Sequence, residues 1–160
     1  MPAKKLKEFL DANGIKYVTI AHSVAYTAQE IASIAHIPGK ELAKTVMVKL
    51  DGKMAMAVLP ASHIVDLDLL REAAGVDDIQ LAQEYEFKSL FPDCETGAMP
   101  PFGNLYGLPV FAAKVLREDD EIAFSAGSHK ELIRVKYADF ERLVQPTVVA
   151  LAAQHVTAGA

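Results

Sequence analysis

The segment KTVMVKLDGKMAMAVLP, residues 44–60, constrains the fold of this chain more than any other stretch. Two runs of β-branched and other apolar residues flank the pair Asp51-Gly52. This pair tolerates the positive backbone angles that a tight two-residue turn requires. The segment therefore predicts a β-hairpin.

Helical and strand-like segments are mixed along the remaining sequence. Helices are expected over residues 4–13, 28–36, 67–74, 83–91 and 138–144, and strands over residues 17–22, 79–82, 108–113, 121–127 and 131–135. Because these segments do not alternate as regular βαβ units, the sequence predicts an α/β (α+β) fold with a mixed, curved sheet flanked by helices.

Capping residues define the ends of several predicted helices. Thr27 followed three residues later by Glu30 is typical of a capping box, and Asp66 is placed to cap the helix that starts at residue 67. Gly14 and Gly75 are natural C-terminal stops. These local signals fix where the helices begin and end.

The length of 160 residues fits a single domain over residues 1–160. We expect its core to span about residues 3–146, and residues 147–160 to form a C-terminal tail that either packs as a final turn or frays. The N-terminal segment has no apolar run long enough for a signal peptide or a membrane span, so we expect a cytoplasmic protein.

The charge of the chain limits its partners. A net charge of −5 argues against a protein that coats long nucleic acid. Residues 40–53 nevertheless carry four lysines against two acids, whereas residues 66–95 carry nine acids against two bases. This distribution suits a partner that offers a few phosphates, and we expect neither a DNA nor a membrane partner.

Cys94 and His22 are the first residues to weigh as reactive groups. Cys94 is the sole cysteine, so the chain forms no internal disulfide and no cysteine-based metal cluster. We expect it to be a half-buried structural thiol, since it would be a nucleophile only beside a histidine. Histidine is the residue type that most often serves as a general base, which makes His22 a candidate, but a single histidine at a strand end is more often structural.

The stretch GAMPPFGNLYGLPV, residues 97–110, concentrates glycine and proline in a chain otherwise rich in helix and strand formers. Glycine lets a ligand approach the main chain and proline stiffens it, so the composition predicts a shaped loop. Two further polar segments lie at ends of predicted strands, Lys44-Thr45 and SAGSH at residues 125–129. Strand ends that meet at one rim commonly form a pocket.

These segments resemble, in order and spacing, the YbaK/EbsC group of aminoacyl-tRNA deacylases, which is related to the editing domain of bacterial prolyl-tRNA synthetases. The resemblance rests on TAQEIA, LAKTVMVK, GAMPPFG, GLPVF and FSAGSHKELIRVKYADFERLV, and it covers nearly the whole chain. It implies the sheet-based fold of that family, without a metal or an organic cofactor. It also implies trans-editing, the hydrolysis of a mischarged amino acid from the tRNA 3′ end.

The resemblance assigns roles to individual residues. Lys44 matches the signature lysine of the family and would hold the terminal phosphate or ribose. Gly97 and Pro101 match its G-x-x-x-P loop, with Pro100 at the variable position, so that loop N–H groups would stabilise the oxyanion. Because the ester is already activated, attack by water or by the substrate's own hydroxyl or thiol would suffice.

Further residues are expected to bind substrate. Thr27 borders the family's pocket, and Gly127, Ser128 and His129 form a turn near it. Met47, Met99 and Phe102 are expected to line the acyl pocket and select its size, and Thr45 and Ala98 adjoin the lysine and the glycine in the sequence. They do not identify the amino acid, and relatives handle proline, alanine, cysteine or serine. Many relatives carry an acid shortly after GLPVF where this chain has Ala112-Ala113, so the recognition role of that acid is absent here.

The expected partner is the acceptor end of an aminoacyl-tRNA, with a synthetase as a further candidate. The residues leave two other functions open: a non-catalytic module that docks on tRNA or a synthetase, and a hydrolase of another small acyl ester. They do not fix the oligomeric state.

Overall fold

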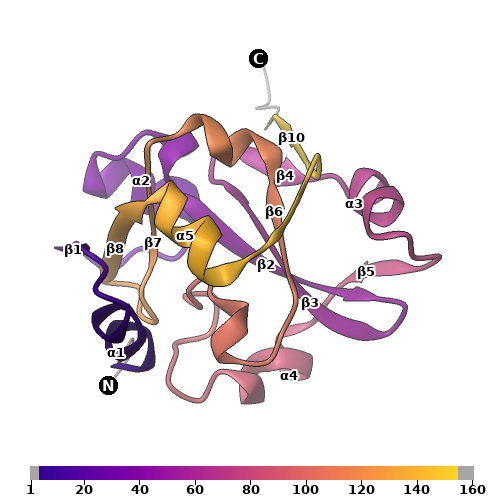
Figure 1. Cartoon of the computed structure of the whole chain (residues 1–160), viewed down its shortest axis with the longest axis horizontal. Helices are drawn as coiled ribbons and strands as arrows, with labels where there is room; N and C mark the ends of the chain where they lie inside the picture. The colour runs from indigo at the N-terminus through magenta and orange to yellow at the C-terminus, as the bar shows by residue number, and fades with distance from the viewer. Residues whose placement is uncertain (1–3, 155–160) are drawn as a thin grey trace.

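The computed structural model describes residues 4–154 (Figure 1). The helices are α1 (Lys4–Ala12), α2 (Ala28–Ala35), α3 (Leu67–Ala74), α4 (Glu84–Phe87) and α5 (Tyr137–Val144). The strands are β1 (Val18–Ala21), β2 (Ala43–Leu50), β3 (Lys53–Pro60), β4 (His63–Val65), β5 (Ile79–Leu81), β6 (Val110–Ala113), β7 (Glu121–Ser125), β8 (Glu131–Lys136), β9 (Thr147–Val149) and β10 (Ala152–Gln154).

The strands form three sheets. The largest has the order β5-β2-β3-β6-β9 and is mixed, because β6 runs parallel to β3 and to β9 while the other pairs are antiparallel. A second, antiparallel sheet has the order β1-β8-β7, and β10 pairs with β4. Figure 1 shows the sheet of β1, β8 and β7 at the left and the long β2–β3 hairpin running to the right.

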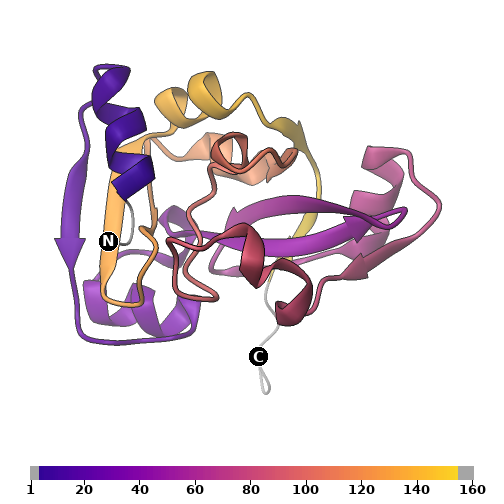
Figure 2. The same ribbon diagram turned by 90° about the horizontal axis from the view of Figure 1, so that it is seen from below.

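The predicted hairpin is confirmed. β2 and β3 pair over their full lengths, from Ala43 opposite Pro60 to Leu50 opposite Lys53. Asp51 (φ 49°) and Gly52 (φ 81°) both take positive φ, as a two-residue turn requires. In Figure 2 the hairpin extends away from the sheet of β1, β8 and β7.

The predicted caps are confirmed as well. The Glu30 N–H donates to the Thr27 hydroxyl at 3.1 Å, and the Leu69 N–H donates to the Asp66 carboxylate at 3.0 Å. Gly75 ends α3 with φ 69°. Each cap satisfies a backbone group that the first or last helical turn leaves unpaired.

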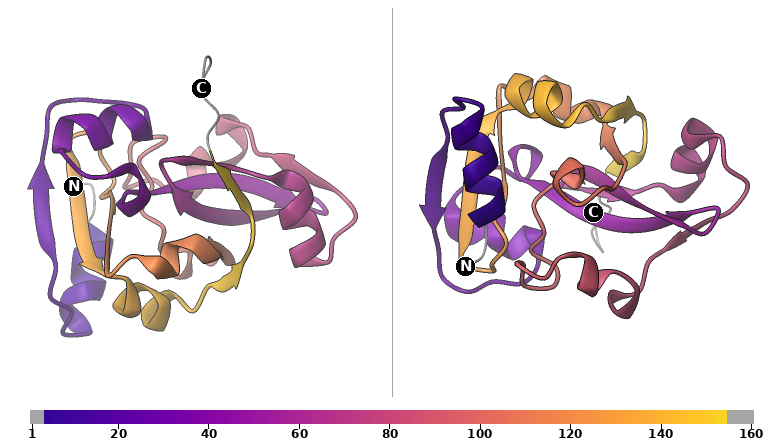
Figure 3. Two further views of the ribbon diagram at one scale, coloured as in Figure 1. Left: turned by 90° about the horizontal axis from the view of Figure 1, so that it is seen from above. Right: turned by 60° about the horizontal axis from the view of Figure 1, so that its bottom comes forward.

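Alternating side chains divide the core. From β7, Ile122 and Phe124 point into the main core with α1 and α5, whereas Ala123 points to the opposite side. There it meets Ile31 of α2 and Leu42. Figures 2 and 3 show α1 lying along β8, and the opposite face of that sheet carries α2.

The structure refines three expectations. The single expected sheet is divided into three, although the largest is mixed as predicted. The helix expected over residues 83–91 changes to a 3-10 turn at Lys88–Leu90. The tail forms β9 and β10 instead of a turn or a frayed end, and its last residues, 155–160, lie outside the described residues.

No helix between residues 4 and 154 is long and apolar enough to cross a membrane.

Candidate functional site

A pocket lies between β2 and β7, where the two strands diverge into different sheets. A single parallel bridge, Leu42 with Ala123, joins the start of β2 to β7. Beyond it, β2 continues in the large sheet beside β3 and β7 remains beside β8, so the strands diverge. The fork between them holds a pocket of about 160 Å³, lined by Tyr26, Ala28, Ile31, Leu42, Ala43, Lys44, Thr45, Gly97, Met99 and Ser125.

The loop that carries Gly97 is fastened to the turn after β7. The Glu95 N–H donates to the Gly127 carbonyl at 2.8 Å, and the Gly127 N–H donates to the Ala98 carbonyl at 2.9 Å. Gly97 and Gly127 both have φ 91°, a region that favours glycine. The two glycines therefore let two loops, distant in sequence, lie against each other at the pocket.

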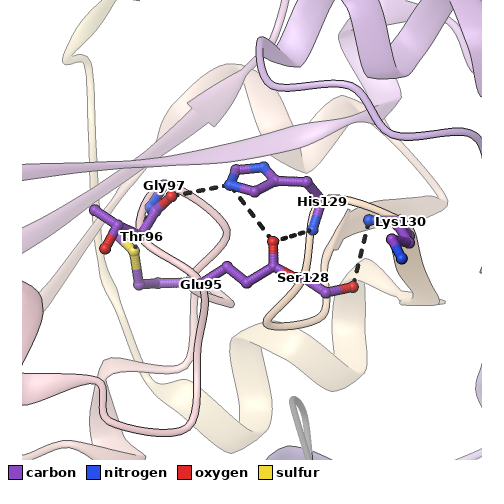
Figure 4. A network of polar contacts seen from close by, with 7 residues as sticks. Glu95, Thr96, Gly97, Ser128, His129 and Lys130 are labelled. Carbon is purple, nitrogen blue, oxygen red and sulfur yellow. Dashed lines mark hydrogen bonds and ion pairs between the residues drawn. The ribbon is translucent and has the colours of Figure 1, made fainter.

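His129 supports this loop through hydrogen bonds to the residues before Gly97 (Figure 4). The residue is 8% exposed, and its Nε2–H donates to the Thr96 carbonyl at 2.9 Å. The His129 N–H donates to a Glu95 carboxylate oxygen at 3.3 Å. On its other side the imidazole packs against the Tyr26 ring, with 4.8 Å between centroids. His129 thus contacts the two residues that precede Gly97 and also Tyr26, which lines the pocket.

Lys44 brings a half-buried cation to the pocket. Partial burial lowers the pKa of its ammonium, and no carboxylate among residues 4–154 offsets that shift. Desolvating a cation without an acidic partner is unfavourable, and an incoming anion relieves it. An anionic group that enters the pocket would therefore pair favourably with Lys44.

The Gly97 N–H faces a weak acceptor. It donates to the Met99 sulfur, with 3.2 Å between nitrogen and sulfur. A thioether accepts a hydrogen bond poorly, so an oxygen that develops negative charge would compete for the same N–H with advantage. The geometry therefore leaves this donor available to a ligand in the pocket.

The pocket has an apolar part and a polar part. Ala28, Ile31, Leu42 and Met99 contribute apolar surface. Ser125 follows Ala123 by two residues on β7, so its side chain points to the same side of the strand as that residue, toward Ile31 and Leu42. Lys44 and Thr45 of β2 line the same pocket as Ser125.

The structure brings four of the sequence-predicted site residues together in the pocket: Lys44, Thr45, Gly97 and Met99. Thr27 lies between two lining residues, where its exposed hydroxyl caps α2. Ala98, Pro100 and Pro101 are buried in the loop, and Met47 and Phe102 lie in the main core. Gly127, Ser128 and His129 form the turn that supports the loop.

Sequence reasoning missed six lining residues: Tyr26, Ala28, Ile31, Leu42, Ala43 and Ser125. Ser125 belongs to the SAGSH segment, and its alternation with buried Phe124 was a signal that it shares a face with Ala123. For the lining residues of α2, Ala28 and Ile31, the sequence indicated only a helix and not a place in the pocket. Only the tertiary fold brings α2 to the fork.

Cys94 and His22 lie apart from the pocket lining. The Cys94 thiol is half-buried beside the Asp93 carboxylate and the Tyr106 hydroxyl, and burial raises its pKa to about 11. It is therefore a protonated thiol at neutral pH and a poor nucleophile. Nδ1 of His22 lies 2.7 Å from the Ser23 carbonyl oxygen.

The chain is similar in sequence to proteins that edit aminoacyl-tRNA. A sequence model of the aminoacyl-tRNA editing domain matches residues 22–143. The multifunctional Ser/Thr-tRNA deacylase ProXp-y of Escherichia coli K12 is 29% identical over 151 residues, which cover 91% of this chain and 90% of the relative. The proline–tRNA ligase of Thiobacillus denitrificans is 26% identical over 78% of this chain, which spans 21% of the ligase.

The fold has solved counterparts. The crystal structure of a candidate trans-editing enzyme for prolyl tRNA synthetase superposes with a TM-score of 0.80 at 20% identity, covering 94% of this chain and 96% of that one. At this level of identity the likeness concerns the fold.

Proposed function

We infer that this chain, which belongs to the family of aminoacyl-tRNA editing domains, is an aminoacyl-tRNA hydrolase that removes a mischarged amino acid from tRNA. The observation that carries the proposal is the fork pocket, in which the Lys44 ammonium and the loop of Gly97 line one small space. A cation for phosphate or ribose and a backbone donor for the ester oxygen are what such a reaction needs.

The Gly97 N–H is the proposed oxyanion donor. It is aligned by its fastened loop before substrate arrives, so little reorganisation is needed when charge develops on the carbonyl oxygen. The oxyanion replaces the Met99 thioether as the acceptor. Lys44 holds the terminal phosphate or ribose of the tRNA, which fixes the position of the ester relative to this donor.

The attacking group comes from outside the protein. The side chains that line the pocket include no histidine, cysteine or carboxylate among residues 4–154. Because the aminoacyl ester is activated, a bound water or a hydroxyl of the substrate is a sufficient nucleophile once it is positioned. The expelled tRNA 3′ end leaves with its ribose oxygen protonated.

We propose a small amino acid with a hydroxyl group, serine or threonine, as the substrate. The Escherichia coli relative is named a Ser/Thr-tRNA deacylase. In this chain, two residues that carry a hydroxyl group, Thr45 and Ser125, line a pocket of about 160 Å³. A site that hydrogen-bonds a substrate hydroxyl rejects an analogue that lacks it more strongly than an apolar pocket rejects a missing methylene.

The experiment is a deacylation panel. Purified protein is incubated with tRNAs charged with serine, threonine, alanine, cysteine or proline, and the remaining ester is followed over time. We expect faster loss of the seryl or threonyl ester than in buffer. Binding of charged tRNA without ester loss would instead indicate the non-catalytic module. Equal turnover of a free aminoacyl ester would indicate a hydrolase that does not need tRNA.

A further inference from the structure

Met99 is in an unusual position for a methionine. Its side chain is 4% exposed, yet it lines the fork pocket, and its sulfur accepts the Gly97 N–H at 3.2 Å. Met47 and Met56 belong to the same core cluster as Met99, but neither of them lines the pocket. Met99 therefore combines contact with the pocket and contact with the proposed oxyanion donor.

Oxidation would change what this sulfur does. A peroxide transfers one oxygen atom to a thioether: an S–O bond forms, the O–O bond breaks, and water leaves. The sulfur loses two electrons and the peroxide gains them. The product, a sulfoxide, is a polar group whose oxygen is a far stronger acceptor than the thioether.

We propose that Met99 is a peroxide-sensitive modification site, and that its conversion to the sulfoxide switches off the fork pocket. The inference rests on the proposed function of that pocket. Where the added oxygen points toward the Gly97 N–H, it accepts the hydrogen bond of that N–H. The N–H is then not available to the ester oxygen. Where it points into the pocket, it fills part of a space of about 160 Å³. Both sulfoxide epimers therefore oppose substrate binding or turnover.

The hairpin supplies a matched control. Met54 lies next to the hairpin turn, is only partly buried, and is not among the residues that line the fork pocket. It is open to oxidation without contact with Gly97. Cys94 needs its own control because it is the other oxidisable group, although its raised pKa keeps it in the less reactive thiol form.

The test treats the full chain with a series of hydrogen peroxide concentrations, removes the peroxide, and measures seryl- and threonyl-tRNA deacylation and the mass of each methionine peptide. Wild type, Met99→Leu, Met54→Leu and Cys94→Ser are compared, each normalised to its own untreated activity. We expect wild type, Met54→Leu and Cys94→Ser to lose at least about 90% of their activity in step with a gain of one oxygen on the Met99 peptide. Met99→Leu should keep its own activity at the same dose, and methionine sulfoxide reductase should restore wild type.

Two results would overturn the proposal: wild type that stays active after Met99 is oxidised, or Met99→Leu that loses activity as fast as wild type. If Met99→Leu is too weak to assay, the wild-type time course decides alone, because activity must fall with the Met99 peptide and return with the reductase. Untreated wild type without deacylase activity would contradict the proposed function instead, so the two failures are distinguishable.

Discussion

At the scale of single residues, Ser125 and Ser128 show how neighbouring hydroxyls differ in what they face. Ser125 lines the fork pocket, whereas the Ser128 hydroxyl accepts a hydrogen bond from the Lys130 N–H at 3.3 Å. Ser125 can therefore meet a ligand, whereas the Ser128 hydroxyl is already hydrogen-bonded within the turn. This contrast gives the substrate proposal a direct test.

We predict that Ser125→Ala lowers kcat/KM for seryl or threonyl esters about fivefold relative to the alanyl ester, because a hydrogen bond contributes on the order of 1 kcal/mol. The ratio is measured in competition between the charged tRNAs. Ser128→Ala is the control and should leave the ratio unchanged. An equal ratio in Ser125→Ala and wild type would refute hydroxyl recognition by this residue.

Gly97→Ala tests the backbone donor. Its φ of 91° disfavours a side chain, but a Cβ there would lie 3.5 Å from the nearest His129 carbon, which is ordinary contact. We expect a loss of roughly 1–2 kcal/mol of unfolding free energy and at least about a tenfold loss of kcat, as the strained residue shifts its N–H.

Gly107→Ala separates strain from catalysis. Gly107 has φ 69° with nothing within 4 Å of an added Cβ, and it does not line the pocket. It should lose similar stability in urea unfolding and keep its kcat. If Gly97→Ala lost stability while keeping full kcat, its N–H would not be the oxyanion donor.

At the scale of elements, the tip of the β2–β3 hairpin is tied to β5. The Asp51 carboxylate accepts hydrogen bonds from the N–H groups of Asp77 and Asp78, at 3.2 and 2.8 Å. The turn is thereby linked to the edge of the large sheet. The pocket lies toward the other end of the hairpin, at Ala43–Thr45.

We predict that Asp51→Ala lowers the free energy of unfolding by about 1–2 kcal/mol, because two backbone donors lose their partner. Urea titration measures the change, and deacylation kinetics should match wild type since the fork is untouched. Asp68→Ala, which removes an exposed ion pair with Arg71, is a control expected to change stability by at most about 0.5 kcal/mol. A large kinetic defect in Asp51→Ala would show that the hairpin tip influences the pocket.

The elements also show what the sequence could predict. The hairpin turn and the caps at Thr27 and Asp66 were predictable because each depends on contacts within a few residues. The division into three sheets was not, since pairing of β1 with β8, or of β6 with β9, depends on segments far apart in sequence. Composition and strand ends pointed to the glycine loop and to Lys44, and the family resemblance assigned their roles, whereas Ile31 and Ser125 reach the pocket only through tertiary packing.

At the scale of the whole molecule, charge is divided between regions. The acid-rich residues 66–95 form α3, β5 and α4, which lie toward the right and bottom of Figure 1. Lys44 lies at the other end of the hairpin. Because an acidic surface repels RNA, the molecule favours approach of the tRNA end from the side of the fork.

Asp119 links folding to pH. Burial, reinforced by the charges of Glu41, Glu118 and Asp120 and opposed by Lys40, raises the pKa of its carboxyl to about 6. The folded state therefore holds its proton more tightly than the unfolded state does, and stability falls as pH rises from about 4 to 6.

We predict that Asp119→Asn is more stable than wild type at pH 7, by on the order of 1 kcal/mol after allowance for solvent screening. The difference should vanish below about pH 4, where wild type is protonated in both states. Thermal unfolding across this pH range measures it. A constant difference at all pH values would show that the carboxyl does not titrate as described.

The proposed editing activity of the fork pocket depends on the Lys44 cation. The most direct measurement is kcat/KM of Lys44→Ala for seryl- and threonyl-tRNA, beside Lys53→Ala, an exposed lysine at the far end of the hairpin. We expect Lys44→Ala to lose at least about 100-fold, with unfolding free energy within about 1 kcal/mol of wild type, and Lys53→Ala to match wild type. Full activity in a folded Lys44→Ala protein would contradict the assignment of this pocket.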